Sequence, residues 1–219
     1  MEDCLDNRSI VSEKRWSVAK LSEARKTIAY YLTQPVVRLL AKTPIAPNAV
    51  SWFGFLLTVG AAALIITEHL FAAGFVVLIA GFFDILDGAL ARSANRTTQF
   101  GAVLDSTLDR LSEAVLLLGI LVLYAREQSA AGILVVGLAL LASPLVSYIR
   151  AKAESLGLEC QVGLFTRAER VIVLALGLLL SQFDYALIAA LAIIVVFSLI
   201  TVTQRLLYVW RQTKKPGNF

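Results

Sequence analysis

Six long apolar stretches dominate the sequence and constrain its fold more than any other feature. They cover residues 48–67, 70–91, 99–125, 130–153, 167–182 and 184–209. A helix needs about 20 mostly apolar residues to cross a bilayer, and here 58% of the residues are hydrophobic while only 16% are charged. The sequence therefore predicts an all-α integral membrane protein with six transmembrane helices, whose short connections make neighbouring helices antiparallel.

The positions of lysine and arginine predict the orientation of these helices. If the N-terminus is cytoplasmic, six spans return the C-terminus to the same side. Only Arg126 of the 20 Lys and Arg residues then falls on the outer side, while Arg110 lies within the third span. This asymmetry follows the positive-inside rule. We therefore expect a multi-pass protein of the cytoplasmic (inner) membrane with both termini in the cytoplasm.

The segments before and after the spans suggest three parts. Residues 1–47 are expected to form a cytoplasmic N-terminus whose segment 28–42 is apolar but too short to span, which favours an amphipathic helix lying in the membrane interface. Residues 48–210 would form the six-span domain, and 211–219 a basic cytoplasmic tail. The net charge of +4 suits an anionic membrane surface and gives little reason to expect nucleic acid as a partner.

Four aspartates interrupt the second and third apolar stretches, namely Asp84, Asp87, Asp105 and Asp109. An ionisable residue inside a membrane-spanning helix is costly and marks a functional site by default. The first two are three residues apart and the last two are four apart, so each pair lies on one face of its helix. Both pairs should lie at a similar depth, roughly 10 Å from the cytoplasmic ends of their helices. We expect them to share one pocket that is open to the cytoplasm.

Carboxylates without His or Cys ligands predict a hard cation, Mg²⁺ or Mn²⁺, rather than zinc. Four of them are enough for two metal ions, which together stabilise both oxygens of a displacement at phosphorus. Because Mg²⁺ often takes ligands from substrate phosphates, a substrate with a pyrophosphate group fits such a site. Two other classes of protein share part of this pattern: an intramembrane prenyltransferase, which uses a lipid diphosphate, and a cation transporter.

The stretch from Asp84 to Asp109 resembles the signature of the CDP-alcohol phosphatidyltransferase family, Asp-x2-Asp-Gly-x2-Ala-Arg-x8-Gly-x3-Asp-x3-Asp, and matches every fixed position. The six-span layout is similar as well. The resemblance implies transfer of a phosphatidyl group from a CDP-linked lipid to the hydroxyl of a small alcohol, with release of CMP. It also implies that Asp84, Asp87 and Asp105 hold the metals. Asp109 would be the general base for the acceptor hydroxyl and could also be a metal ligand.

The same resemblance implies a CDP-lipid site and a homodimer formed through membrane helices. The residues expected to contact the CDP-lipid are Asn48, Ala49, Val50, Ser51, Gly88, Arg92 and Thr98. Gly88 has no side chain, so a substrate could approach the backbone there. Asn48 could also simply cap the first span, since it follows a proline.

Residues 147–157 and 163–170 are similar to the corresponding region of bacterial phosphatidylinositol phosphate synthases. They carry four cations, Arg150, Lys152, Arg167 and Arg170. Arginine holds phosphate in a bidentate way, so an acceptor with its own phosphate is expected. Inositol 1-phosphate is the leading candidate, glycerol 3-phosphate the alternative, and uncharged serine or inositol rank lower. The same cations could instead be anchors at the cytoplasmic ends of helices.

Overall fold

The computed structural model describes residues 47–93, 98–158, 160, 162–163 and 165–214. Within these ranges the chain forms helices and connections but no strand, which confirms the all-α prediction. The helices are α2 (Pro47–Ile66), α3 (Leu70–Ser93), α4 (Gln99–Arg126), α5 (Ala130–Ser155), α6 (Arg167–Leu179) and α7 (Ala186–Thr213). The expected interfacial helix over 28–42 and residues 215–219 of the expected tail lie outside the described residues.

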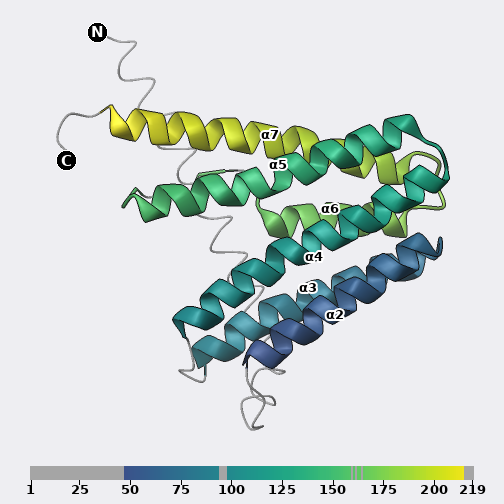
Figure 1. The fold of residues 1–219 in the computed structure, drawn as a ribbon, viewed down its shortest axis with the longest axis horizontal. Coiled ribbons are helices and arrows are strands. Elements are labelled where there is room, and N and C mark those ends of the chain that lie inside the picture. Colours follow the sequence, from purple (N-terminus) through teal and green to yellow (C-terminus); the bar gives the residue numbers. More distant parts are fainter. Residues whose placement is uncertain (1–46, 94–97, 159, 161, 164, 215–219) are drawn as a thin grey trace, which may run out of the picture.

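The six helices run back and forth, so the bundle has two distinct ends (Figure 1). We call the end with the connections 67–69, 127–129 and 180–185 the closed end. At the other end α2, α4 and α6 begin while α3, α5 and α7 end, and we call it the open end. Since neighbouring helices alternate in direction, the second half of α3 and the first half of α4 lie at the open end, as the sequence predicts.

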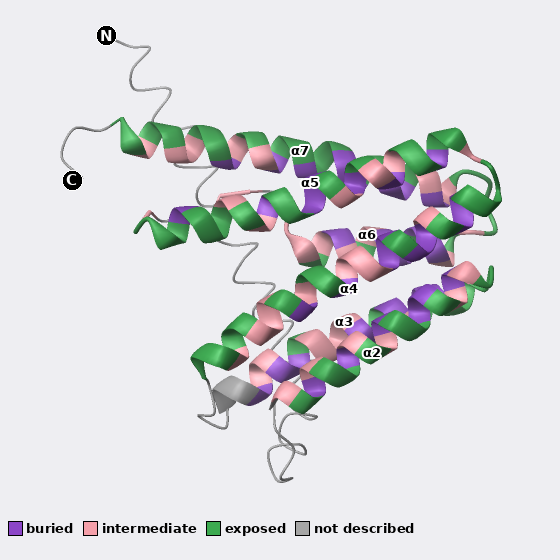
Figure 2. Cartoon of the chain, viewed as in Figure 1, coloured by how far each residue is buried: buried purple, intermediate pink, exposed green. Residues whose placement is uncertain are grey.

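The main hydrophobic core joins the helices toward the closed end. Ile65, Ile120 and Leu178 are fully or almost fully buried there, together with small residues that let helices approach closely. A Cβ atom on Gly119 would lie 3.2 Å from the carbonyl oxygen of Ala62, so α4 and α2 meet at backbone distance. Figure 2 shows buried residues on the facing sides of the helices and exposed residues on their outer sides.

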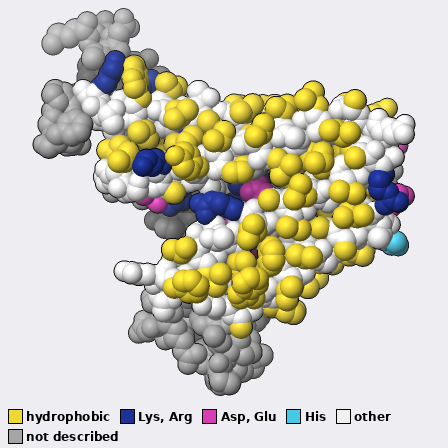
Figure 3. Space-filling model, in the orientation of Figure 1, with side chains coloured by type: hydrophobic (Ala, Val, Ile, Leu, Met, Phe, Trp, Pro, Cys, Tyr) yellow, Lys and Arg dark blue, Asp and Glu magenta, His cyan; other side chains and the backbone are white. Residues whose placement is uncertain are grey.

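The face of the bundle shown in Figure 3 is strongly apolar, and each of the helices α2 to α7 carries large exposed hydrophobic side chains, as expected of a protein surrounded by lipid. The four helices α2, α3, α5 and α7 are long and apolar enough to cross a membrane. The chain is therefore a multi-pass membrane protein. Helix α4 is long but carries charged residues in its first half, and α6 has only 13 residues. At 1.5 Å per residue, α6 spans about 20 Å, less than the roughly 30 Å of a hydrocarbon core.

Two local signals set where the site-bearing helices begin. Thr98 caps α4, because its hydroxyl accepts a hydrogen bond of 2.9 Å from the backbone N–H of Gly101. At the start of α6 the Glu169 side chain accepts a 2.7 Å hydrogen bond from the backbone N–H of Thr166. Arg167 is consequently the first residue of α6, at the point where this helix meets α3 and α4.

Candidate active site at the open end

Three of the four predicted aspartates converge between α3 and α4. One carboxylate oxygen each of Asp84, Asp105 and Asp109 lies within 4.8 Å of the others. Asp87 lies one turn further along α3, is buried, and is not a member of this group. The antiparallel arrangement of the two helices thus brings together carboxylates from both halves of the signature.

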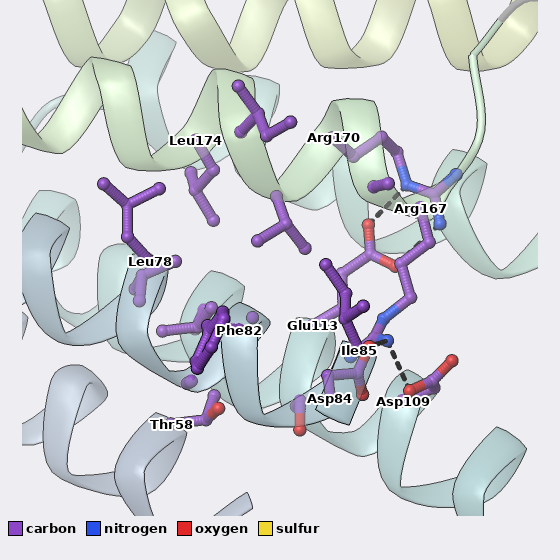
Figure 4. Close-up of a pocket in the computed structure, with 18 of the residues that line it drawn as sticks. Thr58, Leu78, Phe82, Asp84, Ile85, Asp109, Glu113, Arg167, Arg170 and Leu174 are labelled. Carbon is purple, nitrogen blue, oxygen red and sulfur yellow. Dashed lines mark hydrogen bonds and ion pairs between the residues drawn. The ribbon is translucent and has the colours of Figure 1, made fainter. Parts of the chain in front are cut away.

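An arginine from α6 balances these negative charges. Nη1 of Arg167 lies 2.5 Å from Oδ2 of Asp84, and the same nitrogen forms an ion pair with Asp109. Figure 4 shows its guanidinium between the two carboxylates. The sequence analysis assigned Arg167 to the phosphate of the acceptor, whereas in the structure it contacts the aspartates directly. One cation therefore joins three helices at the site.

A second ion pair lies one helical turn deeper. Arg170 donates from Nε to Oε1 of Glu113 at 2.5 Å and from Nη2 to Oε2 at 2.8 Å. Arg170 is 2% exposed, so this bidentate pair is almost fully buried (Figure 4). The sequence analysis did not single out Glu113. A signal was present, because Glu113 follows Asp105 and Asp109 at four-residue steps and shares their face of α4.

A polar pocket of about 490 Å³ opens beside the aspartates, lined by residues of α4, α5, α6 and α7 and the residue before α6. Its cationic lining residues are Arg110, Arg150, Arg167 and Arg205. Arg150 is exposed and paired with Glu154 at 2.8 Å. Lys152, also predicted to bind phosphate, is exposed and is not among the described residues that line this pocket. The pocket therefore includes two of the four predicted phosphate-binding cations.

Arg205 is a further cation of this pocket, which the sequence analysis did not predict as part of the site. It is 4% exposed, and it donates from Nε to the carbonyl oxygen of Val162 at 2.8 Å and from Nη1 to that of Val146. A charged residue within the apolar sixth stretch is unusual, and that signal alone could have identified it. The two hydrogen bonds connect α7 to α5 and to the connection before α6.

An apolar cavity of about 450 Å³ lies on the other side of the charged residues. Most of its lining comes from α3, α4 and α6, with Leu78, Phe82 and Leu174 among them (Figure 4). The apolar cavity and the polar pocket share Asp109, Glu113, Arg167 and Ala168. In the space-filling view, acidic and basic side chains occupy a hollow between apolar surfaces (Figure 3). The apolar cavity, which suits a lipid, and the polar pocket, which suits a phosphate, thus meet at these charged residues.

The residues predicted to contact a CDP-lipid lie at the same end of the bundle. The first turn of α2 carries Asn48 to Ser51. The starts of α2 and α4 lie side by side, because a Cβ on Gly101 of α4 would lie 3.3 Å from Oδ1 of Asn48, as well as 2.9 Å from Oγ1 of Thr98. Val50 packs with Leu86 and Leu90. Leu86 comes directly before Asp87, and Leu90 comes two residues after Gly88. Arg92 belongs to the last turn of α3, and its side chain lies outside the described part of the chain.

The donor atoms of the aspartate group suit a hard divalent cation. All are carboxylate oxygens, and no His or Cys belongs to the group found among the described residues. Mg²⁺ and Mn²⁺ prefer such ligands, whereas zinc sites usually include nitrogen or sulfur. Asp84, Asp105 and Asp109 could therefore hold a metal ion at the boundary between the two cavities.

Comparison with known proteins defines the class of this protein. The model of the CDP-alcohol phosphatidyltransferase family matches residues 44–208. The chain is 38% identical over 188 residues to the archaetidylinositol phosphate synthase of Methanothermobacter thermautotrophicus, covering 83% of this chain and 94% of the relative. It is 37% identical over 186 residues to the phosphatidylinositol phosphate synthase of Mycobacterium tuberculosis, covering 82% and 86%.

Solved structures of the same M. tuberculosis protein share the fold. The crystal structure with CDP-DAG bound gives a TM-score of 0.76 at 34% identity and covers 85% of this chain and 96% of that one. A second crystal structure, in complex with manganese and citrate, gives a TM-score of 0.73 at 35% identity with coverages of 84% and 90%. Fold and site together define a membrane-embedded transferase. The chain belongs to the CDP-alcohol phosphatidyltransferase family, so the other two classes, prenyltransferase and cation transporter, are set aside.

Proposed function

We propose that this protein transfers the phosphatidyl group of CDP-diacylglycerol to inositol 1-phosphate, which forms phosphatidylinositol phosphate for phospholipid biosynthesis and releases CMP. One observation carries the proposal. Asp109 and Arg167 line both the apolar cavity and the polar pocket, and the polar pocket adds Arg150 and Arg205. A phosphorylated acceptor in the polar pocket would therefore lie beside the carboxylates that act on the CDP-lipid.

The carboxylates would divide the chemistry between them. Asp84, Asp87, Asp105 and Asp109 would hold two Mg²⁺ ions, or Mn²⁺ in their place, and bound metal would offset the charge of the diphosphate and of departing CMP. Asp109 would accept the proton of the acceptor hydroxyl while the oxygen of that hydroxyl attacks the phosphorus next to the lipid. A new bond joins this phosphorus to the acceptor oxygen while its bond to the CMP oxygen breaks. Because a proton acceptor is already in place, no covalent enzyme intermediate is required.

The CDP-lipid would bind from the side of α2, α3 and α4. Its nucleotide would contact Gly88, Arg92, Thr98 and the first turn of α2, at Asn48, Ala49, Val50 and Ser51. A lipid chain would extend toward the apolar cavity, whose wall includes Leu78 and Phe82. This assignment places the reactive phosphates where the two cavities meet, as the transfer requires.

The acceptor phosphate would bind the arginines of the polar pocket. Arg150, Arg167 and Arg205 come from three different helices, so together they could surround a phosphate group. Lys152 would add positive charge outside the pocket, and Arg170 would act through Glu113 rather than by direct contact. Both relatives described above are named for inositol phosphate lipids, which favours inositol 1-phosphate over glycerol 3-phosphate.

We also propose a topology for the whole chain. All six helices of residues 48–210 would cross the cytoplasmic membrane, with α4 packed against α2 and α5, and α6 against α3 and α7. The open end, both termini, the interfacial segment of residues 1–47 and the basic tail 211–219 would face the cytoplasm, because the arginines of the polar pocket lie at this end. Exposed apolar side chains on the membrane helices would serve contacts with lipid and with a second copy in a homodimer.

The proposal is tested by CMP release from the purified full chain with Mg²⁺. CDP-diacylglycerol and its isoprenoid counterpart CDP-archaeol would each be supplied with inositol 1-phosphate, glycerol 3-phosphate, serine or inositol, and the lipid product identified by mass. We expect CMP release only with inositol 1-phosphate, with phosphatidylinositol phosphate as the lipid product when CDP-diacylglycerol is the donor, and no CMP after chelation of the metal. A product formed only with glycerol 3-phosphate would overturn the acceptor but leave the chemistry in place. Release with serine or inositol alone would also overturn the role of the arginines.

A further inference from the structure

Two ion pairs connect α4 and α6 at successive helical turns, and we call each pair a rung. Asp109 and Glu113 lie one turn apart on α4, while Arg167 and Arg170 lie about one turn apart on α6. Asp109 pairs with Arg167 in the rung nearer the open end, and Glu113 pairs with Arg170 in the deeper rung. Figure 4 shows both pairs side by side.

The two rungs differ in how firmly they hold their arginine. In the deeper rung Arg170 makes two hydrogen bonds to one carboxylate, and the two side chains are 2% and 11% exposed. In the other rung Arg167 uses one nitrogen for both Asp84 and Asp109. Each arginine has one buried nitrogen without a hydrogen-bond partner among the described residues, Nε of Arg167 and Nη1 of Arg170. Arg167 is also more exposed, at 21%. Arg170 is therefore held by a bidentate and deeply buried pair, whereas Arg167 is held through a single nitrogen and is more exposed.

Arg167 contacts two of the three carboxylates that could hold a divalent ion. The oxygens that it binds on Asp84 and Asp109 belong to residues of the potential metal-binding group. A guanidinium offers only donors, and a metal ion likewise needs the lone pairs of the carboxylates. A divalent ion among these carboxylates would lie next to the guanidinium of Arg167, and the two positive charges would repel each other, so binding of the ion favours departure of Arg167 from at least one carboxylate.

The polar pocket offers Arg167 another position, but at a cost. Arg167 already lines that pocket, so a change of side-chain rotamer could direct it there. Among the acidic residues that line this pocket, Glu113 and Glu154 are already paired with Arg170 and Arg150, and Asp109 belongs to the potential metal site. Arg167 would therefore lose its negative partners on moving, and a tetrahedral phosphate in the pocket would replace them. Displacement by metal is therefore favourable mainly when an anion is available in the pocket.

We propose that Arg167 couples binding of the divalent metal to binding of the acceptor's phosphate, by moving from the aspartates to the polar pocket. The inference rests on the proposed function, since it requires both a metal and a phosphorylated acceptor. Linkage is reciprocal, so phosphate tightens metal binding by the same factor by which metal tightens phosphate binding. The enzyme would consequently bind its metal most tightly when the acceptor is present.

Manganese binding measures this coupling without any turnover. The signal of free Mn²⁺ in electron paramagnetic resonance would be titrated with the full chain, with and without methyl phosphate, a phosphate monoester that has no hydroxyl to act as acceptor. We expect methyl phosphate to tighten Mn²⁺ binding by about fivefold or more in the unchanged protein, which is the usual range of such couplings. Arg167→Gln should bind Mn²⁺ more tightly in the absence of methyl phosphate and should respond little to its addition.

Two further variants make the experiment decisive. Arg167→Lys keeps the charge but not the planar fork, and should retain part of the coupling even if Arg167→Gln folds poorly. Arg126→Gln is the matched control, because Arg126 lies at the closed end of α4 and bonds to the carbonyl oxygen of Ile66. It should keep the full coupling.

Two outcomes would overturn the coupling role alone: no effect of methyl phosphate on the unchanged protein, or full tightening in Arg167→Gln. The second result would mean that phosphate binds the metal directly. If CMP release with inositol 1-phosphate were intact in either case, the proposed function would stand. Failure of the unchanged protein to bind Mn²⁺ at all would overturn the coupling together with the metal-dependent function.

Discussion

The closed end and the open end of the bundle are built from the same helices with opposite kinds of side chain. At the closed end Ile65, Ile120 and Leu178 are buried in a continuous apolar core. Toward the open end α3, α4 and α6 carry Asp84, Asp109 and Arg167 around cavities of about 450 and 490 Å³. Close packing at one end holds the helices together, so the other end can leave room for substrates. The apolar packing and the cavities therefore lie toward opposite ends of the helices, with the buried pair of Glu113 and Arg170 beside the cavities.

The largest loss of turnover is expected from Asp109→Asn. The amide cannot accept the proton of the acceptor hydroxyl, and removal of a general base usually costs between a hundredfold and ten-thousandfold, so we expect a fall in kcat of about a thousandfold. Metal-dependent binding of the CDP-lipid should largely persist. The matched control is Asp184→Asn, an exposed aspartate of the closed end, which should leave kcat unchanged. If Asp109→Asn abolished binding of the CDP-lipid as well, Asp109 would be chiefly a metal ligand.

Glu113→Gln should cause the largest loss of stability. The change leaves Arg170 as a buried charge without its ionic partner, which typically costs about 3–5 kcal/mol. Thermal unfolding in detergent would measure the loss. Glu154→Gln removes the partner of exposed Arg150, a pair between side chains that are 52% and 49% exposed, and should cost less than about 1 kcal/mol. Equal losses in the two variants would mean that the deeper rung does not hold α6 against α4.

Gly177→Ala tests whether packing near the closed end is separate from the chemistry. The new Cβ would lie 2.5 Å from Cβ of Ala190, so α6 and α7 would have to move apart. Overpacking of this kind usually costs about 1–3 kcal/mol. The KM for each substrate should stay close to that of the unchanged protein. Gly137→Ala is the control, because nothing lies within 4 Å of its added Cβ. Raised KM values in Gly177→Ala would show that the two ends are not independent.

The smallest expected effect is a change in acceptor affinity in Gly163→Ala. An added Cβ would lie 2.7 Å from Cγ2 of Thr201 and 3.1 Å from Nε of Arg205. Displacement of that arginine should raise the KM for the acceptor by about tenfold, or roughly 1.4 kcal/mol, and change the KM for the CDP-lipid little. Gly157→Ala is matched to it, since φ is also positive (73° against 138°) but nothing lies nearby. A similar rise in both variants would point to backbone strain rather than to Arg205.

The sequence predicted the parts of this structure that depend on local patterns. Apolar stretches located the helices, so that the predicted range 70–91 compares with Leu70–Ser93 for α3. Fixed spacing on antiparallel helices placed Asp84 near Asp105 and Asp109. The largest differences are at α6, predicted over 167–182 but ending at Leu179, where a turn follows, and at α7, predicted over 184–209 but running from Ala186 to Thr213. Spacing along the chain was sufficient for these features.

Contacts between distant helices could not be predicted in the same way. The pairing of Arg170 with Glu113 and the hydrogen bonds of Arg205 depend on how α4, α6 and α7 are rotated about their axes. Helices that are apolar on nearly every side, because they face lipid as well as core, give little information about that rotation. For this reason Arg170 was predicted to be free for phosphate, and Arg205 was not predicted as part of the site.

The location of the metal is the most direct test of whether the open end is the active site. Crystals of the full chain would be soaked with Mn²⁺, and an anomalous difference map calculated from data collected near the manganese absorption edge. We predict anomalous peaks among the carboxylate oxygens of Asp84, Asp105 and Asp109, with Arg167 displaced from at least one of them. Peaks only at other carboxylates, such as that of Glu154, or a map without a peak between α3 and α4, would contradict the assignment of these aspartates as the metal site.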